Sequence, residues 1–130
     1  MGKNKWRSLV ASFYGAANMD VKAIDTPDLS QTDSIYSVFR GSTSLKGENA
    51  NWNWNTSIIT NMGGVFSDTE NFNQNIGSWD VSNVVFAGGL FNNATAFNNG
   101  GSDSIKNWNT GKMTAMNAMF QNAVKFNQPI

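Results

Sequence analysis

The sequence predicts a repeat solenoid, a fold in which similar short segments stack along one axis. Two observations indicate it: aromatic residues return at a fixed spacing along the chain, and small and polar residues return in the same register. A third observation supports stacking, because a single segment carries too few apolar side chains to fold by itself.

Tryptophan marks the register of the repeat most clearly. Trp54, Trp79 and Trp108 are separated by 25 and then 29 residues. A phenylalanine follows each tryptophan after 12 residues and another after 18 residues, and these are Phe66, Phe72, Phe91, Phe97, Phe120 and Phe126. We expect these six rings to form the structural core of the stack.

The spacing divides the chain into approximate coils inside one domain that covers residues 1–130. The expected coils are 1–26, 27–53, 54–78, 79–107 and an incomplete 108–130. The first two are weaker copies, with Pro27 in place of the tryptophan, and terminal repeats are commonly atypical. Four extra residues before Trp108 fall around 99–102, where glycine and asparagine predict a surface insertion.

The energetics of one segment explain why neighbours must stack. Ordering a segment of 25 residues costs roughly 25–50 kcal/mol of backbone entropy. Burying its roughly five or six apolar side chains returns only about 1.5–3 kcal/mol each. A lone repeat is therefore expected to stay unfolded, and the phenylalanine columns are expected to pack from one coil onto the next.

Each coil is expected to contain two short elements. Apolar residues at offsets near three and four predict one or two turns of α-helix or 3₁₀-helix over 57–66, 82–91 and 111–120. The more polar stretch 72–79 ends in turn residues and predicts a short strand that pairs with its counterpart in the next coil.

The repeat also resembles a known family. The runs Trp79-Asp80-Val81-Ser82-Asn83-Val84, Phe91-Asn92-Asn93-Ala94 and Phe72-Asn73-Gln74-Asn75-Ile76 are similar to the unit of the BspA-like bacterial surface-protein repeat. The resemblance implies a right-handed, leucine-rich-repeat-like coil stack with short parallel strands. It also implies a location outside the cell or at its surface, within a larger exported protein. The glycine pairs 63–64 and 88–89 depart from the family pattern and are expected to loosen the short helix there.

Composition argues against several functional classes. Nine basic and nine acidic residues balance, so we expect no nucleic-acid partner; the one basic cluster is Lys3, Lys5 and Arg7 at the N-terminus. Histidine and cysteine are absent, and no segment is apolar for long enough to insert into a membrane. We therefore expect no enzyme activity, no catalytic residue, no cofactor and no metal. The oxygen-rich loop 98–104 leaves calcium open beside the interpretation as a plain insertion.

The tryptophans and one carboxylate are the candidate binding residues. If Trp54, Trp79 and Trp108 face outward, they form an aromatic ladder for a glycan or a protein; if they face inward, they pack in the core. The register beside the phenylalanines favours packing. Trp52 breaks the repeat pattern and is expected to be an exposed contact, together with Asp80.

Two functions follow from these features. The first is a non-enzymatic recognition or adhesion module that binds protein or glycan at a cell surface. The alternative is a structural element that assembles end to end with other copies and holds no small ligand. An enzyme is the least favoured reading, because no pair of carboxylates is placed as catalysis requires.

Overall fold

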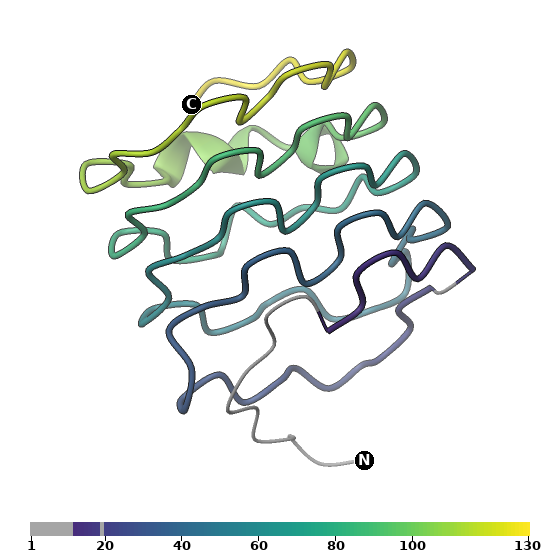
Figure 1. Cartoon of the computed structure of the whole chain (residues 1–130), viewed down its shortest axis with the longest axis horizontal. Coiled ribbons are helices and arrows are strands. Elements are labelled where there is room, and N and C mark those ends of the chain that lie inside the picture. The colour runs from purple at the N-terminus through teal and green to yellow at the C-terminus, as the bar shows by residue number, and fades with distance from the viewer. Residues whose placement is uncertain (1–11, 19) are drawn as a thin grey trace.

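The computed structural model describes residues 12–18 and 20–130. Successive parts of the chain lie above one another in layers, from blue at the lower end to yellow at the upper end (Figure 1). Segments far apart in the sequence are therefore neighbours in space. The basic cluster Lys3, Lys5 and Arg7 lies outside the described residues.

One side of the stack carries four full turn strips, which we define as residues 34–42, 61–69, 86–94 and 115–123. A shorter segment pairs with the first of them, because the N–H groups of Phe13 and Gly15 donate to the carbonyls of Val38 and Arg40. Single parallel bridges join them in register, and these run Ser34–Asn61, Asn61–Phe86 and Phe86–Ala115. Backbone N–H groups of one strip donate to carbonyls of the next: the Phe66 N–H reaches the Leu90 carbonyl at 3.0 Å, and the Phe91 N–H reaches the Met119 carbonyl at 2.8 Å. Along the strips these bonds run from one layer to the next, whereas at the start of the strips the N–H groups of Asn61, Phe86 and Ala115 donate back to the preceding layer.

Each strip is a series of tight turns rather than a strand. Alternate N–H groups turn back onto their own strip, so that Val65 donates to the Met62 carbonyl and Ser67 to the Gly64 carbonyl. Left-handed backbone at Gly64 (φ 65°) and Asp68 (φ 59°) makes these turns possible. Because half of the donors are used within the strip, only isolated bridges form between layers.

The predicted leucine-rich-repeat-like solenoid is therefore wrong for the residues described here. They contain no strand, no sheet and no α-helix, and the only helical elements are two 3₁₀-helices, η1 (Asn99–Gly101) and η2 (Asp103–Asn107). Both lie in or directly after the predicted insertion. The expected parallel strands are absent because turn bonds use the donors that a ladder would need.

The predicted short elements fail for local reasons. The helices expected over 57–66, 82–91 and 111–120 are interrupted by left-handed residues, namely Gly64, Gly89 and Ala118. The strand expected over 72–79 is replaced by side-chain bonding, because the Ile76 N–H donates to Asn99 Oδ1 at 2.8 Å instead of to a backbone carbonyl. Short polar side chains commonly compete with regular structure in this way.

Phenylalanine rings fill the interior in two continuous columns. Phe66 and Phe91 are nearly parallel, at 2° with centroids 5.8 Å apart, and Phe120 continues this column 5.3 Å beyond Phe91. Phe72 and Phe97 stack at 6.0 Å in the second column, and Phe126 follows at 5.8 Å. The first four of these rings are fully buried, whereas Phe120 and Phe126 in the uppermost layer are half-buried.

Asparagine side chains join the layers on the opposite side. Asn73 Oδ1 accepts from the N–H groups of Asn98 and Gly100, at 2.8 and 2.9 Å. Asn98 Oδ1 accepts in turn from the Asn127 N–H at 2.8 Å. These bonds supply interlayer cohesion where no backbone ladder exists.

Candidate functional site

The tryptophan column faces inward. Trp54, Trp79 and Trp108 are only 8, 2 and 7% exposed, and the rings of Trp54 and Trp79 stack at 5.4 Å. The Trp79 Nε1–H donates to the Trp52 carbonyl at 2.7 Å, so its one polar atom is satisfied internally. Of the two orientations considered from the sequence, the structure shows packing, and no exposed aromatic ladder is available to a ligand.

Trp52 is not the exposed contact that its irregular position suggested. It is 6% exposed, its ring lies 5.0 Å from Phe72 edge to face, and its Nε1–H donates to the Gly47 carbonyl at 2.9 Å. This layer lacks a counterpart of the buried Ile76, and the indole fills the interior there. Gly47 makes the room, because a Cβ at that position would lie 2.4 Å from the indole.

Asp80 is exposed, but its carboxylate is engaged in a turn. Ser82 donates to it from Oγ at 2.6 Å and from its N–H at 2.9 Å, and these bonds hold the pKa of Asp80 below the usual 3.8. Asp28, Asn55 and Asn109 cap equivalent turns in the other layers. Asp80 is therefore one member of a structural column that recurs in every layer.

One face of the molecule carries all the large exposed aromatic side chains among the described residues. They are Tyr14, Tyr36 and Phe86, at 58, 42 and 51% exposure. Tyr36 and Phe86 belong to neighbouring outward columns of the turn strips, and Tyr14 lies beside Arg40 in the next column. We call this surface the aromatic face.

A shallow polar trough runs across the aromatic face. Its volume is about 180 Å³, and Gly64 and Gly89 form its floor. The Tyr36 ring lies over Gly63 on one margin, where an added Cβ would come within 3.1 Å of the ring. Asn117 covers Gly88 in the same way two layers further along. The N–H groups of Gly64 and Gly89 donate to the carbonyls of Gly88 and Asn117, so these glycines give the trough its shape and leave its free hydrogen-bonding groups to the side chains around it.

Arg40 stands at the edge of this trough and is the one cation among the described residues that line it. Its guanidinium lies 5.6 Å from the centroid of the Tyr14 ring and 3.9 Å from Asp68 Oδ2. Both side chains of the ion pair are 40% exposed, so water screens their attraction. The guanidinium is oriented by its neighbours but keeps donors that face solvent.

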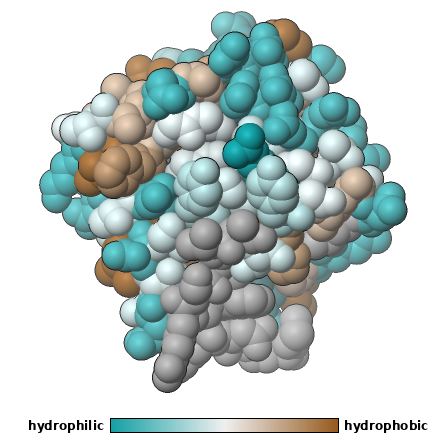
Figure 2. All heavy atoms as spheres, in the orientation of Figure 1, coloured by the Kyte–Doolittle hydropathy of each residue, from teal (hydrophilic) through white to brown (hydrophobic). Residues whose placement is uncertain are grey.

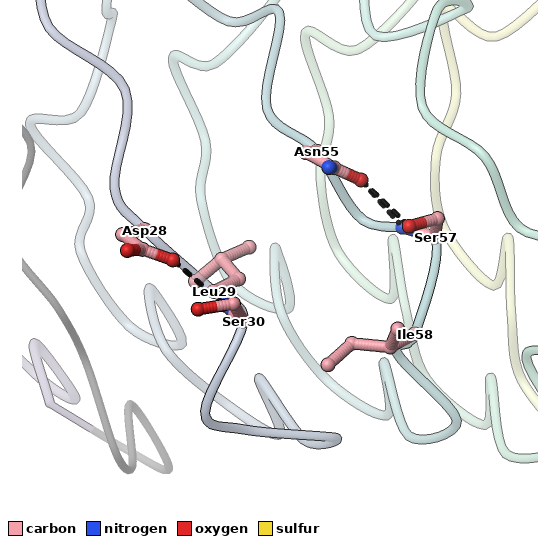
Figure 3. Close-up of a pocket in the computed structure, with 6 residues that line it drawn as sticks. All are labelled: Asp28, Leu29, Ser30, Asn55, Ser57 and Ile58. Atoms are coloured by element: carbon pink, nitrogen blue, oxygen red, sulfur yellow. Dashed lines mark hydrogen bonds between the residues drawn. The ribbon is translucent and has the colours of Figure 1, made fainter.

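A second, larger cleft lies at the corner of the stack between residues 28–30 and 55–58 (Figure 3). Its volume is about 370 Å³. Two turns lie side by side there, one closed by the Ser30 N–H donating to Asp28 Oδ1 at 3.0 Å and the other by Ser57 Oγ donating to Asn55 Oδ1 at 2.7 Å. The side chains of Leu29 and Ile58 point into the space between them.

The cleft exists because one column of bridging side chains is interrupted. In the next layers, Asn83 Nδ2 donates to the Ser57 carbonyl at 2.7 Å and Lys112 Nζ donates to Asn83 Oδ1 at 2.9 Å. Ile58 occupies the equivalent position, 25 residues before Asn83. An isoleucine side chain cannot donate, so the bridge that Asn83 makes has no equivalent at this corner, and Ile58 is 46% exposed.

The loop 98–104 uses its oxygen atoms for hydrogen bonds within the protein. Asn98 Oδ1 accepts from Asn127, Asn99 Oδ1 accepts from Ile76, and Ser104 Oγ donates to Asn75 Oδ1 at 2.9 Å. Within residues 12–18 and 20–130 no group of three or more histidine, cysteine, aspartate or glutamate side chains could hold a metal ion.

Sequence reasoning missed both the trough and the corner cleft. The glycine pairs that floor the trough were visible, but their effect was assigned to helix stability instead of to surface shape. The signal for the cleft was the isoleucine in a column that otherwise holds Asn83 and Lys112. The isoleucine can be recognised as an interruption only once the structure shows that this column of side chains bridges the layers.

The visible surface is mostly hydrophilic or neutral (Figure 2). Hydrophobic residues are scattered over that view and do not merge into one broad patch, which is typical of a surface that faces water. None of the described helices is long and apolar enough to cross a membrane.

Comparison with known proteins identifies a family and little else. No curated protein and no solved structure matches the chain. The family model described as "Mycoplasma protein of unknown function, DUF285" matches residues 7–130, which is nearly the whole sequence. The chain therefore belongs to the DUF285 family.

Proposed function

We propose that this chain is a non-enzymatic recognition module that binds protein or glycan through its aromatic face. The observation that carries the proposal is the exposure of Tyr14, Tyr36 and Phe86 on the side of the turn strips, where Tyr36 lines a polar trough. Exposing three large aromatic rings costs solubility, and tyrosine, phenylalanine and arginine are the residue types enriched at binding surfaces.

The chemistry of this face suits adhesion better than catalysis. The side-chain amides of Asn92 and Asn117 and the Arg40 guanidinium line the trough and offer hydrogen bonds beside the Tyr36 ring. Such a mixture binds planar or hydroxyl-rich partners without any group that titrates near neutral pH.

The BspA-like repeat type belongs to the same proposal. Its support is the motif around Trp79-Asp80 and the repeated Phe-Asn runs, within the family membership already described. A location at the cell surface, within a larger exported protein, follows from that resemblance. Cleavage of the chain on intact cells by an added protease would test it, and full protection in cells that permeabilisation renders sensitive would contradict it.

Substitution on the aromatic face tests the function. The protein would be screened against panels of glycans and extracellular matrix proteins, and the ligand found would be titrated against Tyr36→Ala and Phe86→Ala. We expect each variant to bind about tenfold more weakly, since such side chains contribute about 1–2 kcal/mol at an interface. The control is Ile24→Ala, at another residue that is 78% exposed. Binding unchanged in both aromatic variants, with all proteins folded, contradicts the proposal.

End-to-end self-assembly is the second candidate, and one observation favours it. The N–H groups of Met116, Ala118, Phe120 and Asn122 continue the donor columns of the lower strips but have no acceptor within the described part of the chain. A hollow of about 330 Å³ beside them is lined by Met116, Phe120 and Ile130. Unpaired backbone next to exposed apolar side chains favours pairing with another copy.

Light scattering over a range of protein concentration distinguishes the two candidates. Self-assembly predicts a mass that rises with concentration and returns to that of a monomer in Met116→Glu. A constant monomer mass of the unmodified chain contradicts assembly and leaves the recognition proposal standing.

A further inference from the structure

The corner cleft between residues 28–30 and 55–58 is a site of its own, distinct from the aromatic face. We infer that it binds a single neutral sugar unit. The inference rests on two observations. The column of side-chain bridges that Asn83 and Lys112 form in the next layers is interrupted at this cleft, and the cleft is lined by four polar and two aliphatic side chains.

Two side-chain bridges that join the layers at the next corner have no equivalent at this one. Between the next two layers, Thr56 Oγ1 donates to the Asp80 carbonyl at 2.9 Å and Asn83 Nδ2 donates to the Ser57 carbonyl. Leu29 and Ile58 occupy the positions of Thr56 and Asn83. Neither can donate, so these two side-chain bonds have no equivalent between residues 28–30 and 55–58.

One backbone acceptor is left without a donor as a result. Ser30 has the position of Ser57, whose carbonyl accepts from Asn83. The carbonyl of Ser30 accepts no hydrogen bond from any residue in the described ranges. Because Ser30 is exposed, its carbonyl is open to water and can equally accept from a ligand that carries a donor.

The lining matches a sugar in polarity. Asp28 and Asn55 present oxygen acceptors, and Ser30 and Ser57 present hydroxyls that can donate or accept. A sugar hydroxyl also donates and accepts. Leu29 at the floor and Ile58 at the rim offer an apolar wall for the C–H face of a pyranose ring.

Charge and size restrict the ligand further. None of the described residues that line the cleft is a lysine or an arginine, and Asp28 is acidic, so phosphorylated, sulfated and sialylated ligands are disfavoured. The volume of about 370 Å³ lies near the lower end for ligand sites, which suits one ring and excludes a helix or a strand of a protein partner.

The chain supplies a matched pair of variants for the test. Ile58→Asn should place an amide at the position of Asn83, bridge to the Ser30 carbonyl and close the cleft. Ile24→Asn makes the same chemical change at a residue that is 78% exposed and does not line the cleft. Any general effect of a new asparagine will appear in both.

The probes are the methyl glycosides of glucose, galactose, mannose and N-acetylglucosamine, with sialic acid as the anionic comparison. Each is titrated into isotope-labelled protein while amide and methyl NMR signals are followed. We expect saturable shifts at Ser30, Ser57 and Ile58 with at least one neutral glycoside, retained in Ile24→Asn and about tenfold weaker or lost in Ile58→Asn.

Three results would overturn the inference. They are the absence of saturable shifts with every neutral glycoside, equal affinity in Ile58→Asn with the fold intact, and stronger binding of sialic acid than of the neutral sugars. Because the aromatic face is unchanged in both variants, loss of macromolecular binding at that face would be seen separately.

Discussion

Two corners of the molecule are built from the same repeat and differ in whether side-chain hydrogen bonds join their layers. Between residues 55–58 and 80–83, side chains of Thr56 and Asn83 join adjacent layers by hydrogen bonds of 2.9 and 2.7 Å. Between residues 28–30 and 55–58, Leu29 and Ile58 take those positions and a cleft of about 370 Å³ remains. The phenylalanine column is equally spaced beside the two corners, since Phe39–Phe66 and Phe66–Phe91 both stack at 5.8 Å, although Trp52 packs against the first pair. A surface site can thus arise from two side chains while the spacing of the phenylalanine column stays regular.

The largest expected effect tests whether the interior is in fact equal at both corners. Phe91→Ala and Phe39→Ala each remove a fully buried ring and should each destabilise the protein by about 3–5 kcal/mol. The free energy of unfolding would be measured by urea titration. A much smaller loss in Phe39→Ala would show that the open corner weakens the core beneath it.

Converting the closed corner into an open one should have the next largest effect. Asn83→Ile removes the donor to the Ser57 carbonyl and the acceptor of Lys112, so we expect a loss of about 1–2 kcal/mol. Urea titration measures the loss, and NMR should show a second cleft through new sugar-dependent shifts at Ser57 and Ser82. Full stability in this variant would mean that the bridge contributes nothing to the seal.

The reverse change should have a smaller effect of opposite sign. Ile58→Asn adds a bridge to the Ser30 carbonyl and loses the apolar contacts of a side chain that is 46% exposed, so the net gain is small. We expect a gain of about 0.5–1.5 kcal/mol in the free energy of unfolding. Thermal unfolding at matched concentration would detect it, with Ile24→Asn as the variant that should show no gain.

The smallest expected effect is on the stability of the protein at low pH. The Ser82 hydroxyl and N–H hold the pKa of Asp80 below 3.8, so the unfolded chain takes up the proton more readily than the folded one. The contribution of Asp80 to the free energy of unfolding is fully present above pH 3.8 and is lost as the pH falls through the lower pKa of the folded state. Asp80→Asn keeps an acceptor for the turn but should flatten this part of the stability curve. An unchanged acid dependence would show that other carboxylates account for it.

Much of the arrangement could be anticipated from spacing. The interval between Trp54 and Trp79 groups Phe66 with Phe91 and Phe72 with Phe97, and these rings stack in pairs. The orientation of Trp52 could not be anticipated, because it depends on the missing counterpart of Ile76 and on the space over Gly47. The trough likewise depends on where Tyr36 lies relative to glycine one layer away.

The sequence by itself determined which residues share an environment, because a fixed repeat places equivalent side chains in equivalent positions of successive layers. Only the tertiary structure decided what the backbone does between them. Strands and serial turns satisfy the same spacing, and the choice rests on left-handed residues such as Gly64 and Asp68 and on which N–H groups bond within a layer. The same holds for the cleft, since an interlayer bridge joins residues about 25 positions apart and its absence is a property of two layers together.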